Sequence, residues 1–221
     1  MEKSFHFILG PIDIDLSIIT IWGIMLALSL TAWLSTRKLK LNPGPLQTVV
    51  ESIVAAVDEA VLAVAPEHGR LIMPFIASLW LFLIVANLVG LVPGLHSPTR
   101  DLSVTSALAV LVFFSVPWFG IKTHGLKNYL RHYLTPSPIL LPFHIISEFT
   151  RTLALAIRLF GNMMSLEMAA MLILLVAGFL APIPILMLHI IEALVQAYIF
   201  GMLALIYVAG AVQTQQLDRK E

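Results

Sequence analysis

The sequence predicts an all-α polytopic membrane protein with five transmembrane helices, one amphipathic interfacial helix, and a long, strongly tilted hairpin made by the last two helices. Its 221 residues are 59% hydrophobic and 12% charged, and the mean hydropathy is +0.93. A typical soluble domain carries roughly 25% charged residues. The apolar residues form runs that reach the length of about 20 residues needed to cross a hydrocarbon core. We therefore predict a single membrane domain over residues 1–221.

Composition also limits the function classes. The chain has 13 basic and 13 acidic residues, so no net charge favours a nucleic-acid partner. The absence of cysteine excludes disulfides, thiolate metal sites and a cysteine nucleophile. No metal-ligand spacing, phosphate-binding loop or nucleophile pattern occurs in the sequence. We expect no cofactor, no bound metal and no site for ATP chemistry on this chain.

Residues 16–35 form the first expected crossing, because they begin with a long uncharged run that covers most of a ~30 Å hydrocarbon core. Basic residues follow the first, third and last crossings: Arg37, Lys38, Lys40, Lys122, Lys127, Arg131, Arg219 and Lys220. Positive charge is retained on the cytoplasmic side of membrane proteins. The N-terminus is therefore expected outside and the C-terminus in the cytoplasm.

Residues 45–65 predict an amphipathic helix rather than a crossing. Glu51, Asp58 and Glu59 recur at helical spacing among apolar residues. Three acids in one segment are costly in hydrocarbon. We expect this helix in the cytoplasmic interface or packed on the next spans.

Residues 71–92 and 102–120 are the second and third expected crossings. In the second, Ser78 and Asn87 are expected to donate hydrogen bonds to neighbouring helices. Between the two crossings, Asp101 is expected to be a solvated loop residue or the cap of the helix that starts at residue 102.

Residues 140–180 and 185–212 form the last two expected helices, joined at a proline-containing turn. Both are longer than the ~20 residues that an upright span requires, which predicts strong tilt. No internal repeat occurs in the sequence, although many secondary transporters are built from such repeats.

Charged side chains in the first of these long helices stand out, because a guanidinium remains protonated even in apolar surroundings. Arg151, Arg158 and Asn162 follow one another at steps of seven and four residues and share a face of the helix. Glu148 can pair with Arg151 near the cytoplasmic entrance, whereas Glu167 falls on the side opposite Arg158. Ionisable groups inside a bilayer typically mark ion paths.

The last helix carries a matching polar stripe. His189, Glu192 and Gln196 stand at steps of three and four residues, and Tyr207 continues the same face. Structural explanations remain open at this point: His189 can be a packing histidine, and Glu148 with Arg151 can be an interfacial ion pair. Arg151 alone can also extend to the lipid headgroups.

Two segments of these helices, ALAIRLFGNMMSLE and LHIIEALVQAYIFGMLALIYV, resemble subunit a of the rotary F-type ATP synthases. Weaker similarity appears in PLQTVVES and NLVGLVPG, so the resemblance covers most of residues 10 to 212. It implies an ion-translocating stator subunit in a bacterial cytoplasmic membrane. The implied partners are the c-ring, the peripheral-stalk b subunits, the lipid membrane, and a proton or sodium ion.

The resemblance also implies roles for individual residues. Arg158 would be the stator arginine that faces the ion-binding carboxylate of the rotating c-ring, with Asn162 beside it. The half-channel open to the outside would be lined by Glu167, His189, Glu192 and Gln196. Glu148, with Arg151 nearby, would lie at the cytoplasmic exit.

The chain departs from the family pattern in two ways. It carries both Glu167 and Glu192, whereas many family members carry only one of these carboxylates, so the inlet is expected to be unusually acidic. The segment EFTRTLAL and the short chain resemble the sodium-associated branch of these synthases. Two alternatives remain: a self-contained proton- or sodium-coupled secondary transporter, and a purely structural membrane subunit.

Overall fold

The computed structural model describes residues 7–9, 12–14, 16–37, 44–92, 95, 97–126, 141–177 and 183–217. Within these ranges, five helices are long and apolar enough to cross a membrane, which confirms the predicted polytopic helical class. The helices are α1 (Leu16–Thr36), α2 (Pro45–Val64), α3 (Gly69–Val89), the short 3-10 helix η1 (Pro98–Arg100), α4 (Leu102–His124), α6 (Leu141–Ala177) and α7 (Ile183–Leu217).

A small β-hairpin precedes α1 in this otherwise helical structure and was not predicted. Strands β1 (Phe7–Leu9) and β2 (Ile12–Ile14) pair antiparallel, with Leu9 opposite Ile12. In the sequence these short apolar runs flank a Gly-Pro pair, a combination that favours a turn between strands. The long hydrophobic runs that dominate the chain concealed this local signal.

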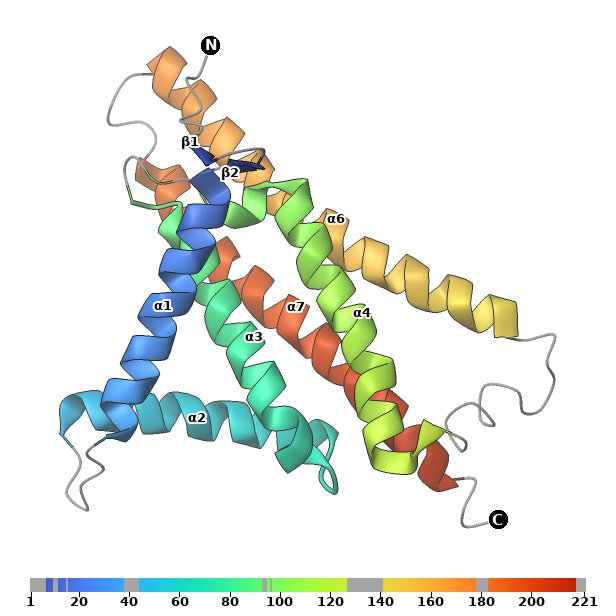
Figure 1. Cartoon of the computed structure of the whole chain (residues 1–221). Helices are drawn as coiled ribbons and strands as arrows, with labels where there is room; N and C mark the ends of the chain where they lie inside the picture. Colours follow the sequence, from blue (N-terminus) through green and yellow to red (C-terminus); the bar gives the residue numbers. More distant parts are fainter. Residues whose placement is uncertain are drawn as a thin grey trace.

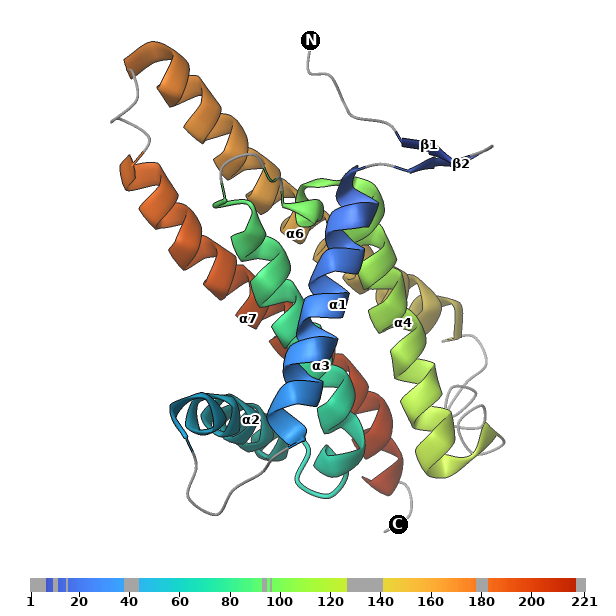
Figure 2. The ribbon, with the colours of Figure 1, turned by 60° about the vertical axis from the view of Figure 1, so that its left-hand side comes forward.

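The helices form a bundle with two distinct ends (Figure 1). One end carries η1, the start of α4 and the joined ends of α6 and α7, and is termed the η1 end. The other carries α2 and the C-terminal part of α7, and is termed the α2 end. Figure 2 shows α6 and α7 slanting side by side past α1 and α4, as expected for a tilted hairpin.

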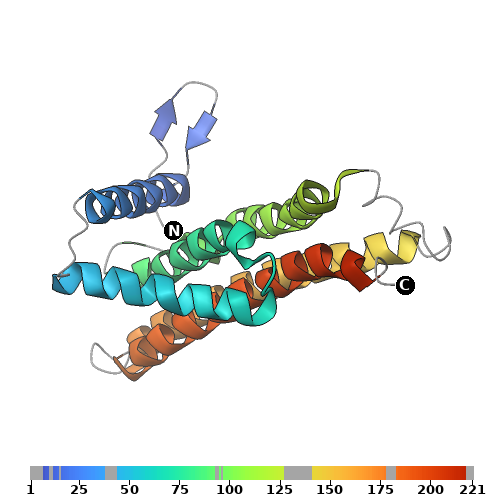
Figure 3. The ribbon, with the colours of Figure 1, turned by 90° about the horizontal axis from the view of Figure 1, so that it is seen from below.

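Helix α2 runs across its end of the bundle (Figures 1 and 3). Val57 and Val61 are buried in the common core, whereas Glu51 and Glu59 are exposed. The amide of Gln213 on α7 donates to the carbonyl of Val64 at 2.7 Å and ties α2 to the last helix. The amphipathic pattern therefore corresponds to a helix that packs one face on the spans.

Several element ends differ from the predicted ranges. Helix α4 continues to His124, α7 continues to Leu217, and α3 ends at Val89. Parts of some predictions lie outside the described residues: residue 140, residues 178–180, and the basic residues Lys38, Lys40, Lys127, Arg131, Arg219 and Lys220.

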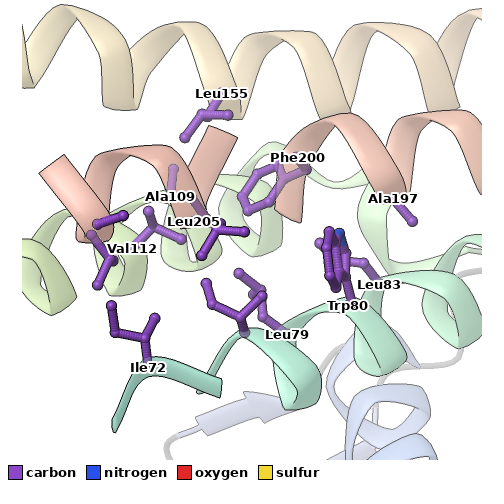
Figure 4. Packing of buried hydrophobic residues seen from close by; sticks show 14 of the residues in the cluster. Ile72, Leu79, Trp80, Leu83, Ala109, Val112, Leu155, Ala197, Phe200 and Leu205 are labelled. Carbon is purple, nitrogen blue, oxygen red and sulfur yellow. The ribbon is translucent and has the colours of Figure 1, made fainter. Parts of the chain in front are cut away.

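The core centres on the contact between α3 and α7. Figure 4 shows Phe200 and Leu205 of α7 lying between Leu155 of α6 and Leu79 of α3. These four side chains belong to one buried cluster. Small residues on α7, including Ala193, Ala197 and Ala204, are fully buried. Small side chains let membrane helices approach closely, where dispersion rather than water exclusion stabilises the contact.

Helices α3 and α7 come closest to each other at Gly201. A Cβ at this position would lie 1.8 Å from Nε1 of Trp80, which is far inside van der Waals contact. The indole cannot move away easily, because it donates to the carbonyl of Tyr198 at 3.3 Å and stacks on the Tyr198 ring with centroids 6.0 Å apart. A side chain at residue 201 would therefore separate α3 from α7.

We predict that Gly201→Ala destabilises the chain by at least the about 1–3 kcal/mol typical of overpacking. The measurement is the thermal unfolding midpoint of the detergent-solubilised protein, together with its level in membranes. Gly210→Ala on the same helix is the matched control, because no neighbouring heavy atom lies within 4 Å of its added Cβ. Equal midpoints for the two variants would contradict this account of the interface.

Candidate functional site

Arg158 lies on an exposed part of α6 and has no counter-charge among the described residues. The adjacent Ile157 and the earlier Leu153 are 54% and 48% exposed, whereas Leu155 and Leu159 are buried in the bundle. Across the described ranges, no side chain forms an ion pair or hydrogen bond with the exposed guanidinium. The cation is therefore accessible to a negative group from outside the chain.

Asn162, one turn after Arg158, joins the two long helices. Its Nδ2 donates to Oε1 of Gln196 on α7 at 2.9 Å. Gln196 is only 2% exposed, and its Nε2 has no hydrogen-bond partner in the described part of the chain. The structure thus brings together two residues that the sequence placed on separate helices, and it leaves one buried amide donor for another group.

His189 and Glu192 continue the polar stripe of α7 toward the η1 end. His189 is 5% exposed, and its Nε2 lacks a hydrogen-bond partner among the residues described. Glu192 is half-buried and forms no ion pair or hydrogen bond with any described residue. Buried polar groups are usually satisfied by protein or ordered water, and leaving one unsatisfied costs about 1–3 kcal/mol. These groups are therefore suited to contact water or an ion.

Glu167 differs from Glu192, because it has a charged partner in this chain. Nη1 of Arg100 lies 2.7 Å from Oε1 of Glu167, and the two side chains are 30% and 20% exposed. The pair joins η1 to α6 at the η1 end. Its geometry agrees with the predicted placement of Glu167 away from Arg158, but the arginine partner was not predicted.

Residues 97–101 form a polar hub around η1. The Ser97 hydroxyl donates to the carbonyl of Ala86 at 2.9 Å, and the Thr99 hydroxyl donates to Oδ1 of Asn87 at 2.8 Å. Nδ2 of Asn87 in turn donates to the carbonyl of Ala193 on α7 at 3.1 Å. Through Asn87, the hub therefore reaches the stretch of α7 between His189 and Gln196.

The same hub contacts α1 and α6. The Ser17 hydroxyl of α1 donates to the carboxylate of Asp101, and Arg100 binds Glu167 of α6. Asp101 occupies the N-cap position of α4, but its side chain makes no capping hydrogen bond. The hub thus connects the start of α1, the last turns of α3 and Glu167 of α6 to the start of α4.

Near the start of α6, the expected ion pair between Glu148 and Arg151 is not formed, although both residues are described. The guanidinium of Arg151 instead lies over the ring of Tyr207, 5.4 Å from its centroid. A cation over an aromatic face is attracted by the ring quadrupole. Tyr207 therefore contributes to this end of the site, while Glu148 remains half-buried.

The sequence interpretation missed part of this arrangement. Asn87 donates to another helix as predicted, but Ser78 donates to the carbonyl of Phe75 within its own helix. Arg100 and Thr99 had no assigned role, because they follow a proline in an apparent loop. The feature of the sequence that could have predicted the ion pair is Arg100, which follows a proline in a chain that carries both Glu167 and Glu192.

The sequence is similar to that of proteins of known family. Residues 18–209 match the family model described as the ATP synthase A chain. The chain belongs to this family. It is 62% identical over 218 residues to ATP synthase subunit a 2 of Pelobacter propionicus, covering 99% of this chain and 95% of the relative. It is 64% identical over 205 residues to ATP synthase subunit a 1 of Hahella chejuensis, covering 93% and 87%.

A further relative, ATP synthase subunit a of Legionella pneumophila, is 54% identical over 214 residues, which cover 96% of this chain and 93% of the relative. These matches confirm the family resemblance found in the sequence. Together with the five candidate spans, they identify an integral membrane protein of bacterial type.

We predict that Asn87→Leu lowers the stability of the bundle. Asn87 is fully buried, and its loss leaves the Thr99 hydroxyl and the Ala193 carbonyl without the partners they have now. The Thr99 hydroxyl still has the Ser97 hydroxyl at 2.6 Å and the Ala193 carbonyl stays within helix α7, so the cost is that of two lost hydrogen bonds, about 0.5–1.5 kcal/mol each. The unfolding midpoint of the solubilised protein should fall, whereas Ser78→Ala should leave it nearly unchanged, because that exposed hydroxyl bonds only within α3. A midpoint for Asn87→Leu as high as that of Ser78→Ala would contradict a bridging role for Asn87.

Proposed function

We propose that this chain is the ion-translocating stator subunit of an F-type ATP synthase and that Arg158 faces the ion-binding carboxylates of a rotating c-ring. The observation that carries the proposal is the exposed Arg158 guanidinium, which has no counter-charge among the described residues of a membrane protein. Charges within spans ordinarily face a partner or water. A carboxylate that arrives on another subunit would supply that partner.

The role of Arg158 follows from electrostatics. Opposite charges at close range attract strongly where water is scarce, so the guanidinium favours an ionised carboxylate beside it. A carboxylate that carries a proton or sodium ion would release it before it reaches Arg158. The fixed cation would also repel ions that move directly between the two half-channels. Net transport would then require rotation of the ring.

The external half-channel would be formed by Glu167, His189, Glu192 and Gln196, with Asn162 at its inner end. Support comes from the contact of Asn162 with Gln196, one turn from Arg158, and from the unsatisfied nitrogens of His189 and Gln196. These groups can exchange hydrogen bonds with water or with a transported ion. The energy available is about 2.3 kcal/mol per charge for each 100 mV of membrane potential.

The cytoplasmic exit would lie near Glu148 and Arg151, at the other end of α6. The C-terminal end of α1, all of α2 and the end of α7 share the α2 end of the bundle (Figure 1). Arg37 and Lys122 end two of the spans that lead there. Because basic residues favour the cytoplasmic side, we assign the α2 end to the cytoplasm and the η1 end to the outside.

The proposed partners are the c-ring and the b subunits of the peripheral stalk. Exposed apolar side chains continue along α6 and α7 beside Arg158, including Ile157, Met164, Ile191 and Val195. A ring of apolar helices would cover such a surface within the membrane. The lipid bilayer would cover the exposed apolar side chains that remain.

We predict that Arg158→Ala reduces ATP-driven ion pumping by about 100-fold or more, since a preorganised charge of this kind typically contributes two to three orders of magnitude. Pumping is measured in inverted membranes that hold the complete synthase, with a pH-sensitive dye and with radioactive sodium. Arg37→Ala is the control, because that exposed arginine stacks on Trp33 of α1 instead of lying on the hairpin. Pumping that survives Arg158→Ala, in membranes with normal levels of the chain, would refute the stator role.

We further predict that His189→Ala combined with Glu192→Gln slows ion flux by about tenfold or more, as expected when ion-exchanging groups are removed. The amount of assembled complex should stay normal, because neither side chain has a hydrogen-bond partner among the described residues that depends on it. Flux through the membrane sector and complex assembly are measured on the same membranes. Loss of assembly with proportionate loss of flux would favour a packing role instead.

A further inference from the structure

The two carboxylates at the η1 end of the hairpin occupy different electrostatic environments. Glu167 is paired with Arg100 at 2.7 Å, whereas Glu192 forms no ion pair with any residue of the described ranges. An ion that binds at Glu167 must compete with a fixed guanidinium, which cannot lose its charge. An ion that binds at Glu192 meets no such competitor within the described part of this chain.

Arg100 is also placed where its pairing affects the shape of the hairpin. It belongs to the polar hub of residues 97–101, which holds α1 through Ser17 and α3 through Asn87. The pair with Glu167 connects the hub to α6 by a charged hydrogen bond. Loss of either charge would remove this ion pair and leave the remaining charge without its present counter-ion in a partly buried position, which is unfavourable.

We propose that Arg100 is a positioning residue of the external half-channel: by pairing with Glu167 it fixes α6 against the hub and removes Glu167 from ion exchange. Glu192 is then the carboxylate that takes up and releases the transported ion. This inference rests on the proposed stator function. It also accounts for the presence of two carboxylates, because Arg100 balances one of them and leaves a single unpaired acid in the inlet.

The test uses neutral variants in membranes that carry the complete synthase. Arg100→Gln and Glu167→Gln should each reduce ATP-driven pumping by about fivefold or more, because each removes the ion pair between η1 and α6. The double variant Arg100→Gln with Glu167→Gln should pump at least about twofold better than either single variant, since the two neutralisations compensate one another. Normal pumping by both single variants would overturn the proposal.

Glu192→Gln provides the matched comparison on the neighbouring helix. It should reduce pumping about tenfold, and adding Arg100→Gln should not restore it, because the two side chains are not paired. If the double variant of Arg100 and Glu167 is as impaired as Glu167→Gln alone, with normal membrane levels, Glu167 itself exchanges the ion and the proposal fails.

A charge exchange keeps the proposal testable if the neutral variants are poorly inserted. Arg100→Glu combined with Glu167→Arg preserves an attractive pair but removes any carboxylate from position 167. We expect this variant to be inserted and to pump, and an inserted but inactive chain would overturn the proposal. Arg158→Ala is measured in parallel, because retained pumping there would refute the stator function itself, whereas failure of rescue alone would refute only the role of Arg100.

Discussion

The arrangement of the helices depends on one constraint, which is that polar groups in a bilayer find no hydrogen-bond partners in the hydrocarbon. At the η1 end the protein meets this constraint internally. Asn87 is satisfied on both sides, by the Thr99 hydroxyl and the Ala193 carbonyl, and so links η1, α3 and α7. Apolar packing alone specifies helix positions weakly in lipid, because lipid tails are equally apolar. These few directional contacts therefore define how the spans meet.

In the hairpin of α6 and α7, some polar and charged groups lack a partner within the described part of the chain. The nitrogens Nε2 of His189 and Gln196 are buried without partners, and Glu192 and Arg158 have no counter-charges among the described residues. In contrast, the stretch where α7 packs on α3 is lined by alanines and Gly201 and contains the closest helix contact. One helix thus provides both a tightly packed face and a polar face.

Charge balance connects these two regions. Glu167 and Glu192 lie on consecutive helices, yet only Glu167 has a described arginine partner. A paired carboxylate fixes structure, and an unpaired one can bind a mobile ion. The hub around η1 therefore places one of the two acids in an ion pair and leaves the other without a counter-charge in the described part of the chain. Arg158 is the complementary case, a cation that has no counter-charge among the described residues.

The sequence by itself determined the number, order and type of the spans and the face on which Arg158 lies, because hydropathy and helical period are local properties. It could not determine which polar groups meet. Arg100 and Glu167 are separated by 67 residues, and Asn87 and Ala193 by 106. Such contacts depend on the relative positions of packed helices, so only the tertiary structure decided that Glu167 is paired. The same reason explains why Arg151 lies over the ring of Tyr207 instead of pairing with Glu148, three residues away in its own helix.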